Sequence, residues 1–281
     1  ERHAREHGKR NVTAYMLNFD PLLADGAFVA DARAMLGTLQ DAYQNPVDVE
    51  FTVNFTEDGS YLINLVQCRP FQVKVTMDAG QAKMPKLVDE GLTVVKSSGP
   101  VIGPGLASII DRFIYVVPAE YSRLPIQDRY AVARLIGQVT HLEGSRDLTI
   151  MLIGPGRWGT RSPSLGVPVT FAEINTSSVL CEMAVMHEGL VPDLSLGTHF
   201  FNDLVEMDMI YMAVFPEKPG NAMEYARFLE ARNRLTDLAP GAARFAKAVR
   251  VIDSGDLGAG YKTYLRADPM RQEAVCYLAP E

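Results

Sequence analysis

The fold of the first part of the chain is decided by two segments, Val47-Asp48-Val49-Glu50-Phe51 and Leu65-Val66-Gln67-Cys68-Arg69-Pro70. Both alternate polar with apolar residues, which is the period-two pattern of a half-buried strand. Between them lies Glu57-Asp58-Gly59-Ser60, whose composition is typical of a turn. We therefore expect a β-hairpin with Glu50 on the first strand and Gln67 and Arg69 on the second.

These three side chains suit a magnesium nucleotide. Residues two apart on a strand share a face, so Gln67 and Arg69 are expected to point the same way. Carboxylate and amide oxygens are ligands for a hard cation, and a guanidinium group forms a planar fork for phosphate. The alternation alone is also what a half-exposed hairpin without a ligand shows, so a purely structural hairpin is the alternative.

The ordered pair of segments resembles the end of the ATP-grasp domain in the phosphoenolpyruvate synthase and pyruvate phosphate dikinase family. In that family an Asp-Ile-Glu-like strand precedes a Leu-Gln-x-Arg-Pro strand, and here the matching residues are Asp48-Val49-Glu50 and Val66-Gln67-Cys68-Arg69-Pro70. The resemblance implies an ATP-dependent phosphotransferase with a pyruvate-like acceptor. It further implies that Glu50 and Gln67 hold Mg²⁺ and that Arg69 is the catalytic residue that neutralises charge on the transferring phosphates of ATP.

Composition bounds the remaining possibilities. The chain has 281 residues, 47% of them hydrophobic, which is enough for two domains with their own cores. The net charge of −7 argues against nucleic acid as a partner. No apolar run reaches the roughly 18 residues that a membrane span needs. Together with three widely spaced cysteines, Cys68, Cys181 and Cys276, which indicate no disulfide framework, these features predict a cytoplasmic protein without a membrane partner.

Two domains are expected, with an α+β (mixed α/β) fold overall. Residues 1–78 would form the C-terminal part of an ATP-grasp domain, including a helix between Asp20-Pro21 and Asn45-Pro46 that packs behind the hairpin. Residues 79–281 would form an α+β domain with a mixed or antiparallel sheet. Its clearest expected elements are a buried strand at 113–117, a helix over 127–142 and a strand at 148–153. The charged segment that begins with Glu1 is typical of a piece of a longer protein. The remaining domains of that protein would then be partners of this chain. Without them we expect the chain to be inactive.

The strand at 148–153 leads into Gly154-Pro155-Gly156-Arg157-Trp158-Gly159-Thr160-Arg161. The glycine spacing satisfies the dinucleotide fingerprint, but Pro163, Gly166 and Pro168 exclude the helix that this fingerprint requires. Glycines with exposed amides and two arginines can still bind a small anionic substrate, which makes Gly154, Gly156, Arg157 and Arg161 candidate ligand-binding residues. The alternative is a tight turn that buries Trp158 and uses the arginines in ion pairs.

The segment Ile153 to Val169 resembles an Ile-Gly-Pro-Gly-Arg-Trp-Gly stretch in the C-terminal parts of large bacterial proteins related to pyruvate phosphate dikinase. No chemistry is assigned to that stretch. A non-catalytic anion-binding or regulatory module is therefore an alternative to the phosphotransferase, and a structural coupling domain without a ligand is a third possibility.

The dikinase family also passes phosphate through a histidine in a Thr-Ser/Cys-His-Ala-Ala motif. The nearest sequence here is Gly197-Thr198-His199-Phe200-Phe201, which makes His199 a candidate phosphocarrier. Two phenylalanines replace the small residues of the family motif. A histidine at the edge of a hydrophobic core is the alternative.

Overall fold

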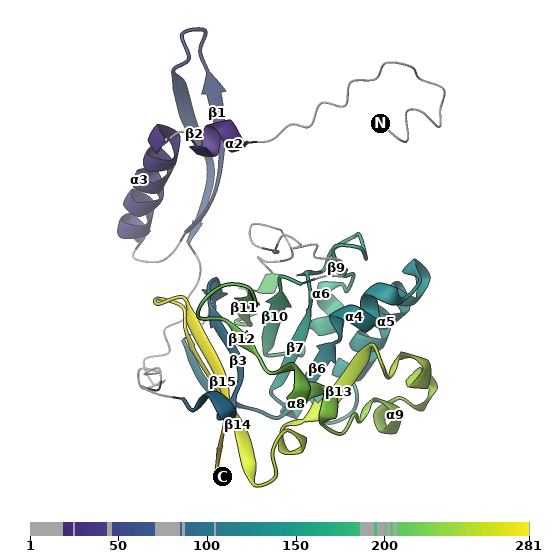
Figure 1. Cartoon of the computed structure of the whole chain (residues 1–281). Helices are drawn as coiled ribbons and strands as arrows, with labels where there is room; N and C mark the ends of the chain where they lie inside the picture. The colour runs from purple at the N-terminus through teal and green to yellow at the C-terminus, as the bar shows by residue number, and fades with distance from the viewer. Residues whose placement is uncertain are drawn as a thin grey trace, which may run out of the picture. The chain divides into compact units, whose positions relative to one another are not determined.

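The computed structural model divides the chain into two compact units, Glu1–Phe71 and Gln72–Glu281 (Figure 1). Each unit is described by itself. The residues that the structure describes are 19–24, 26–43, 47–70, 85, 88–103, 105–185, 194–195, 200, 203–204 and 207–280.

Unit 1 is a helix packed on a two-stranded hairpin. Its elements are α2 (Asp20–Ala24), α3 (Gly26–Tyr43), β1 (Val47–Phe55) and β2 (Tyr61–Pro70). The expected turn closes the hairpin: the Thr56 amide donates to the Ser60 carbonyl at 2.9 Å, and Gly59 adopts the left-handed conformation at φ 84°. The predicted hairpin is therefore confirmed, and so is the helix before it.

Aromatic contacts hold α3 against the hairpin. Phe28, the buried residue of α3, lies 6.4 Å from the Phe51 ring and 5.8 Å from the Tyr61 ring, measured between ring centroids. The Tyr61 hydroxyl also donates to Asp31 of α3 at 2.7 Å. Because Phe51 faces the helix, alternation turns its neighbour Glu50 toward the opposite face of the hairpin.

Unit 2 contains two sheets. The six-stranded sheet has the order β13-β6-β7-β10-β11-β4, and the five-stranded sheet has the order β12-β3-β15-β14-β5. Their bounds are β3 (Thr93–Ser98), β4 (Val101–Ile102), β5 (Leu106–Ile110), β6 (Arg112–Val116), β7 (Ile150–Pro155), β10 (Val179–Met183), β11 (Ile210–Val214), β12 (Ala222–Met223), β13 (Val249–Asp253), β14 (Tyr261–Asp268) and β15 (Glu273–Pro280). Strands β6, β7, β10 and β11 are parallel, whereas β13 and β4 are antiparallel to their neighbours. The five-stranded sheet is antiparallel throughout.

The two sheets share one hydrophobic core. Alternate residues of the parallel strands, such as Met151, Cys181 and Met212, pack with Leu265 and Cys276 of the five-stranded sheet. The other face of the six-stranded sheet is covered by α4 (Pro118–Arg123), α5 (Ile126–Thr140) and α6 (Phe171–Ile174) (Figure 1). Unit 2 is thus layered as helices, mixed sheet and antiparallel sheet, which confirms the predicted α+β fold class.

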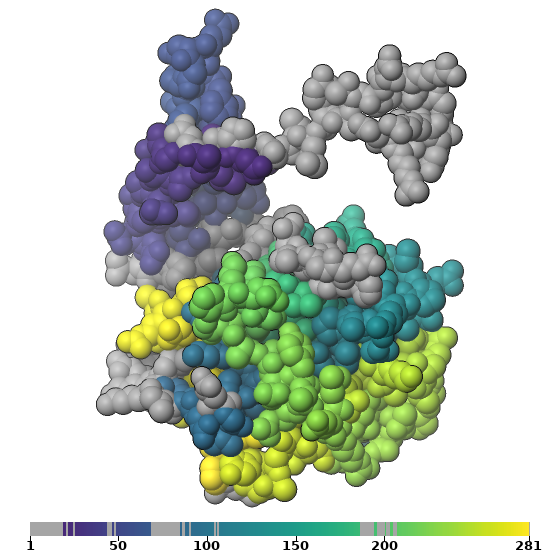
Figure 2. Space-filling view, in the orientation of Figure 1, coloured from purple at the N-terminus to yellow at the C-terminus, as the bar shows by residue number. Residues whose placement is uncertain are grey.

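Short elements complete unit 2. They are the helices α8 (Tyr225–Glu230) and α9 (Leu235–Leu238), the 3-10 turns η1 (Glu90–Leu92), η2 (Ser145–Asp147), η4 (Pro240–Phe245) and η5 (Ser254–Asp256), and the two-residue strands β8 (Arg157–Trp158) and β9 (Gly166–Val167). Figure 2 shows the segment around β12 and α8 on the surface of this unit. Asn233 lies between α8 and α9, and its side-chain oxygen accepts from the amides of Leu235 and Val251, both at 3.0 Å. Among the described residues, no helix is long and apolar enough to cross a membrane.

Candidate functional site

The hairpin brings two of the three predicted site residues together. Glu50 lies directly opposite Gln67 in the β1–β2 ladder, and two residues further on Asp48 pairs with Arg69. Directly opposed residues share a face, with Cβ atoms about 4.5–5.5 Å apart. The Glu50 side chain is exposed and that of Gln67 is half-buried. The Arg69 side chain lies outside the described residues, so its predicted approach to the pair remains a prediction.

A β-bulge creates this pairing. Phe51 pairs with Leu65, and the register shifts between Glu50 and Phe51, so that Val66 is the extra residue and Gln67 becomes the partner of Glu50. Without the bulge Glu50 would oppose the valine, since antiparallel pairing advances one residue on each strand. Bulges commonly re-aim side chains in this way next to functional sites. The alternating pattern of the sequence carries no signal for this shift.

The donor set fits a magnesium ion in part. Glu50 and Gln67 offer a carboxylate oxygen and an amide oxygen, whereas Mg²⁺ takes six oxygen ligands. Within the described parts of the chain, no group of three or more acidic, histidine or cysteine side chains is arranged to hold a metal. The remaining ligands would therefore have to be water and the phosphates of a nucleotide, as is usual for this ion.

The second predicted site, the Gly154–Arg161 loop, follows β7 and is built differently from the expectation. Its amides do not face a ligand: those of Gly156, Arg157 and Gly159 donate to the carbonyl groups of Met183 (2.8 Å), Leu165 (2.9 Å) and Val167 (2.9 Å), respectively. The prediction that these glycines expose amides to an anion is therefore wrong. The amides are already satisfied, as buried backbone groups generally are.

The glycines are needed for close packing instead. A Cβ atom on Gly154 would lie 2.6 Å from Cζ2 of Trp158, and one on Gly156, whose φ is +62°, would lie 2.2 Å from the Leu165 carbonyl oxygen. Trp158 is 1% exposed, and its indole nitrogen donates to the Cys181 carbonyl at 3.3 Å. The alternative of a tight turn that buries the tryptophan is thus correct for this part of the loop.

A buried carboxylate holds the loop in place. Glu182 of β10 is fully buried, and its Oε1 accepts from the Trp158 amide at 2.8 Å and from the Ser195 hydroxyl. Its Oε2 accepts from the Ser195 amide and from the Tyr211 hydroxyl, both at 2.8 Å. Four donors satisfy both carboxylate oxygens of Glu182. Glu182 therefore links the Gly154–Arg161 loop, called the arginine loop below, to β11 and to the segment at Ser195.

Burial dominates the electrostatics of this cluster. Burial raises the pKa of Glu182 above its ordinary value of 4.5, although the hydrogen bonds from Ser195, Trp158 and Tyr211 act in the opposite direction. Burial and the neighbouring Glu182 also raise the pKa of Tyr211, and the positive charge of Arg157 opposes that shift. Arg157 therefore lies within electrostatic reach of the buried cluster.

The two arginines differ in exposure. The Arg157 side chain is half-buried, whereas that of Arg161 is exposed and its carbonyl accepts from the Tyr130 hydroxyl at 3.1 Å. Both follow the carboxyl end of β7, beside the ends of the parallel strands β10 and β11. Their role as anion ligands stays a prediction that now depends on the guanidinium groups alone.

The candidate phosphocarrier His199 lies outside the described residues. Its neighbour Phe200 is described, and its ring packs against Phe171 with centroids 6.5 Å apart. The same ring closes over Gly159, where a Cβ atom would meet it at 2.3 Å. The phenylalanine that departs from the family motif is therefore a packing residue.

Glu182, Ser195 and Tyr211 were not predicted from the sequence as one cluster. They come from three separate segments, and no spacing rule connects them. Comparisons of the chain with protein-family models, with curated proteins and with solved structures found no match.

Proposed function

We propose that this chain is part of an ATP-dependent phosphotransferase of the phosphoenolpyruvate synthase and pyruvate phosphate dikinase type, with a small pyruvate-like anion as acceptor. The observation that supports it is the direct pairing of Glu50 with Gln67 on the face of the hairpin opposite α3. In this proposal these two residues hold Mg²⁺, which when bound neutralises the charge of the nucleotide phosphates. Arg69 binds the transferring phosphates with its guanidinium group.

The hairpin supplies one wall of a nucleotide site. Beside Glu50 and Gln67 the apolar side chains Leu62 and Val66 are 64% and 63% exposed. Nucleotide sites are concave and bury most of their ligand, which a single hairpin with one helix cannot do. We therefore propose that other domains of the parent protein cover this apolar surface and complete the site. A cytoplasmic location agrees with the three free cysteines, Cys68, Cys181 and Cys276.

The test uses the protein expressed at its full natural length. With pyruvate and magnesium ATP, we expect phosphoenolpyruvate to form, and Glu50→Gln to lower the rate by about 100-fold or more, as loss of a charge-stabilising group commonly does. Glu57→Gln is the matched control, because it makes the same change at an exposed position in the turn of the same hairpin. Glu50→Gln activity equal to that of Glu57→Gln would contradict the proposal.

A second candidate function is an anion-binding regulatory module in unit 2. The observation in its favour is the fixed position of Arg157 at the carboxyl ends of parallel strands, where open α/β sheets usually bind ligands. Trp158, the single tryptophan of the chain, is its neighbour and reports on the loop by fluorescence. Titration with inorganic phosphate, followed by Trp158 fluorescence, tests this candidate.

A further inference from the structure

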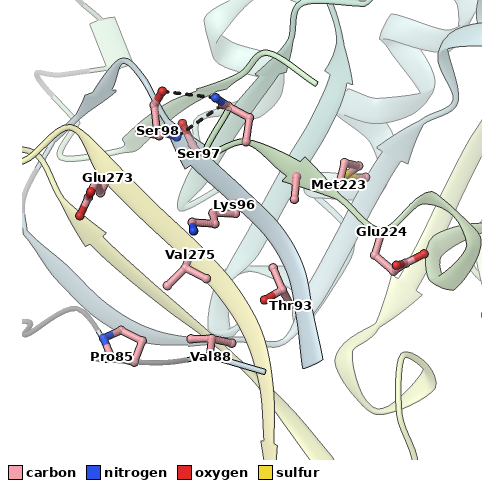
Figure 3. Close-up of a pocket in the computed structure, with 13 residues that line it drawn as sticks. Pro85, Val88, Thr93, Lys96, Ser97, Ser98, Met223, Glu224, Glu273 and Val275 are labelled. Atoms are coloured by element: carbon pink, nitrogen blue, oxygen red, sulfur yellow. Dashed lines mark hydrogen bonds between the residues drawn. The ribbon is translucent and has the colours of Figure 1, made fainter. Parts of the chain in front are cut away.

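A groove of about 700 Å³ lies over β12, β3 and β15, at one end of the five-stranded sheet (Figure 3). It occupies the face of the sheet turned away from the core, since Glu273 alternates with the core residues Ala274 and Cys276 along β15. Its volume is within the range of small-molecule sites. The groove has no part in either function proposed above.

Two opposite charges face this groove without pairing. Lys96 of β3 is exposed and Glu273 of β15 is half-buried, and the structure gives neither side chain an ion pair among the described residues. Figure 3 shows both side chains on the same side of the sheet. Two unpaired charges of opposite sign in one groove are suited to a ligand that carries both signs.

The strand register sets the spacing of these charges. Lys96 pairs with Val275, and Glu273 pairs with Ser98, so Lys96 and Glu273 are diagonal neighbours on adjacent strands. Diagonal neighbours lie about 7–8 Å apart, with their Cβ atoms somewhat closer. At that separation the Lys96 ammonium group can bind the carboxylate of a small molecule while the Glu273 carboxylate binds the ammonium group of the same molecule.

The rest of the lining restricts the ligand further. Glu224 adds a second carboxylate, so the charged side chains among the described lining residues are negative in sum and disfavour a polyphosphate or nucleotide. Val275, Val88 and Met223 give the groove an apolar part. Thr93 and Ser98 add hydroxyl groups that can accept or donate hydrogen bonds.

We propose that this groove binds a zwitterionic ligand of amino-acid size with an aliphatic side chain. Lys96 pairs with its carboxylate, Glu273 pairs with its ammonium group, and the aliphatic chain lies against Val275 and Met223. The proposal goes beyond the phosphotransferase and does not depend on it, because the described residues that line the groove all belong to unit 2.

Calorimetric titration of the 281-residue chain with L-leucine tests the proposal. We expect binding in about the micromolar to millimolar range. Isocaproate lacks the ammonium group and isoamylamine lacks the carboxylate, so both should bind about 10–100-fold more weakly, which is the usual loss for one charged hydrogen-bonded contact. Lys96→Met and Glu273→Gln should each weaken leucine binding by a similar factor.

Controls separate the site from general charge effects. Lys247→Met and Glu230→Gln make the same changes at exposed positions outside the groove and should leave leucine binding unchanged. Circular dichroism checks that each variant is folded. The proposal is overturned if millimolar leucine gives no binding heat, if isocaproate binds as well as leucine, or if folded Lys96→Met and Glu273→Gln variants bind leucine like the wild type.

Discussion

Replacing Glu182 should destabilise unit 2 and disorganise the arginine loop. Glu182→Ala leaves the amides of Trp158 and Ser195 and the hydroxyl of Tyr211 without their acceptor in a buried place. Each unsatisfied buried donor costs about 1–3 kcal/mol, and removing the buried charge returns part of this loss. We expect the free energy of unfolding to fall by about 4 kcal/mol, since breaking a buried charged network typically costs 3–5 kcal/mol.

Urea denaturation followed by Trp158 fluorescence measures the free energy of unfolding, and Trp158 is itself a hydrogen-bond partner of Glu182. Glu182→Gln keeps one acceptor oxygen and should lie between the wild type and Glu182→Ala. Glu143→Ala is the matched control, because this carboxylate is exposed and should change the free energy of unfolding by less than about 0.5 kcal/mol. A loss below about 1 kcal/mol for Glu182→Ala, with unshifted Trp158 emission, would refute the role of the carboxylate as the link between the three segments.

The same comparison has a defined pH dependence. Burial raises the pKa of Glu182 in the folded state above 4.5, so the folded protein retains the proton over a window in which the unfolded chain has released it. The stability from this group is complete below pH 4.5 and declines as the pH rises through the folded-state pKa. The difference in free energy of unfolding between the wild type and Glu182→Ala should therefore narrow with rising pH. A difference that widens would show that the four donors, rather than burial, dominate.

Three further predictions concern the two candidate sites. The 281-residue chain should show no micromolar binding of magnesium ATP in titration calorimetry, because a hairpin with one helix could form only one wall of the proposed nucleotide pocket; micromolar affinity would mean that the chain holds a complete site. Arg157→Ala should weaken phosphate binding, followed by Trp158 fluorescence, by about tenfold with little change in melting temperature, whereas lower stability with unchanged phosphate binding would make the arginine structural. Gly156→Ala should lower the free energy of unfolding by about 3 kcal/mol, because its φ is +62° and its Cβ would meet the Leu165 carbonyl oxygen at 2.2 Å, while Gly241→Ala, with open space around it, should be nearly neutral in urea denaturation.

Local patterns of the sequence were sufficient to predict the elements that depend on neighbouring residues. The hairpin follows from alternation and a turn around Gly59, and α5 follows from apolar residues at helical spacing. A convergence of Glu50, Gln67 and Arg69 was expected, and of these the ladder places Glu50 opposite Gln67; the bulge at Val66 that produces this pair was not predicted. A bulge requires no particular residue type. It only shifts the pairing register of the two strands by one residue, and the alternation of polar and apolar residues does not show where such a shift occurs.

Contacts between distant segments could not be predicted. The amides of the arginine loop are occupied by carbonyl groups of Leu165, Val167 and Met183, and the sequence does not show which acceptors will be near. Glu182 has the same difficulty, because its donors Ser195, Trp158 and Tyr211 are 13, 24 and 29 positions away in the sequence. A single glutamate in an apolar strand signals that a buried charge must be satisfied, but not by which groups.

The position of β15 in its sheet has a consequence for how unit 2 is made. β15 lies between β3 and β14, so a strand near residue 95 acquires its central neighbour only when residues 273–280 have been synthesised. During translation β3 has no partner on that side, and the core around Val94 and Val95 still lacks Ala274, Cys276 and Leu278. The five-stranded sheet can therefore be completed only after β15 has been synthesised. Until then β3 keeps an unpaired edge, and we expect this edge to be the part of unit 2 that is most prone to pair with another chain.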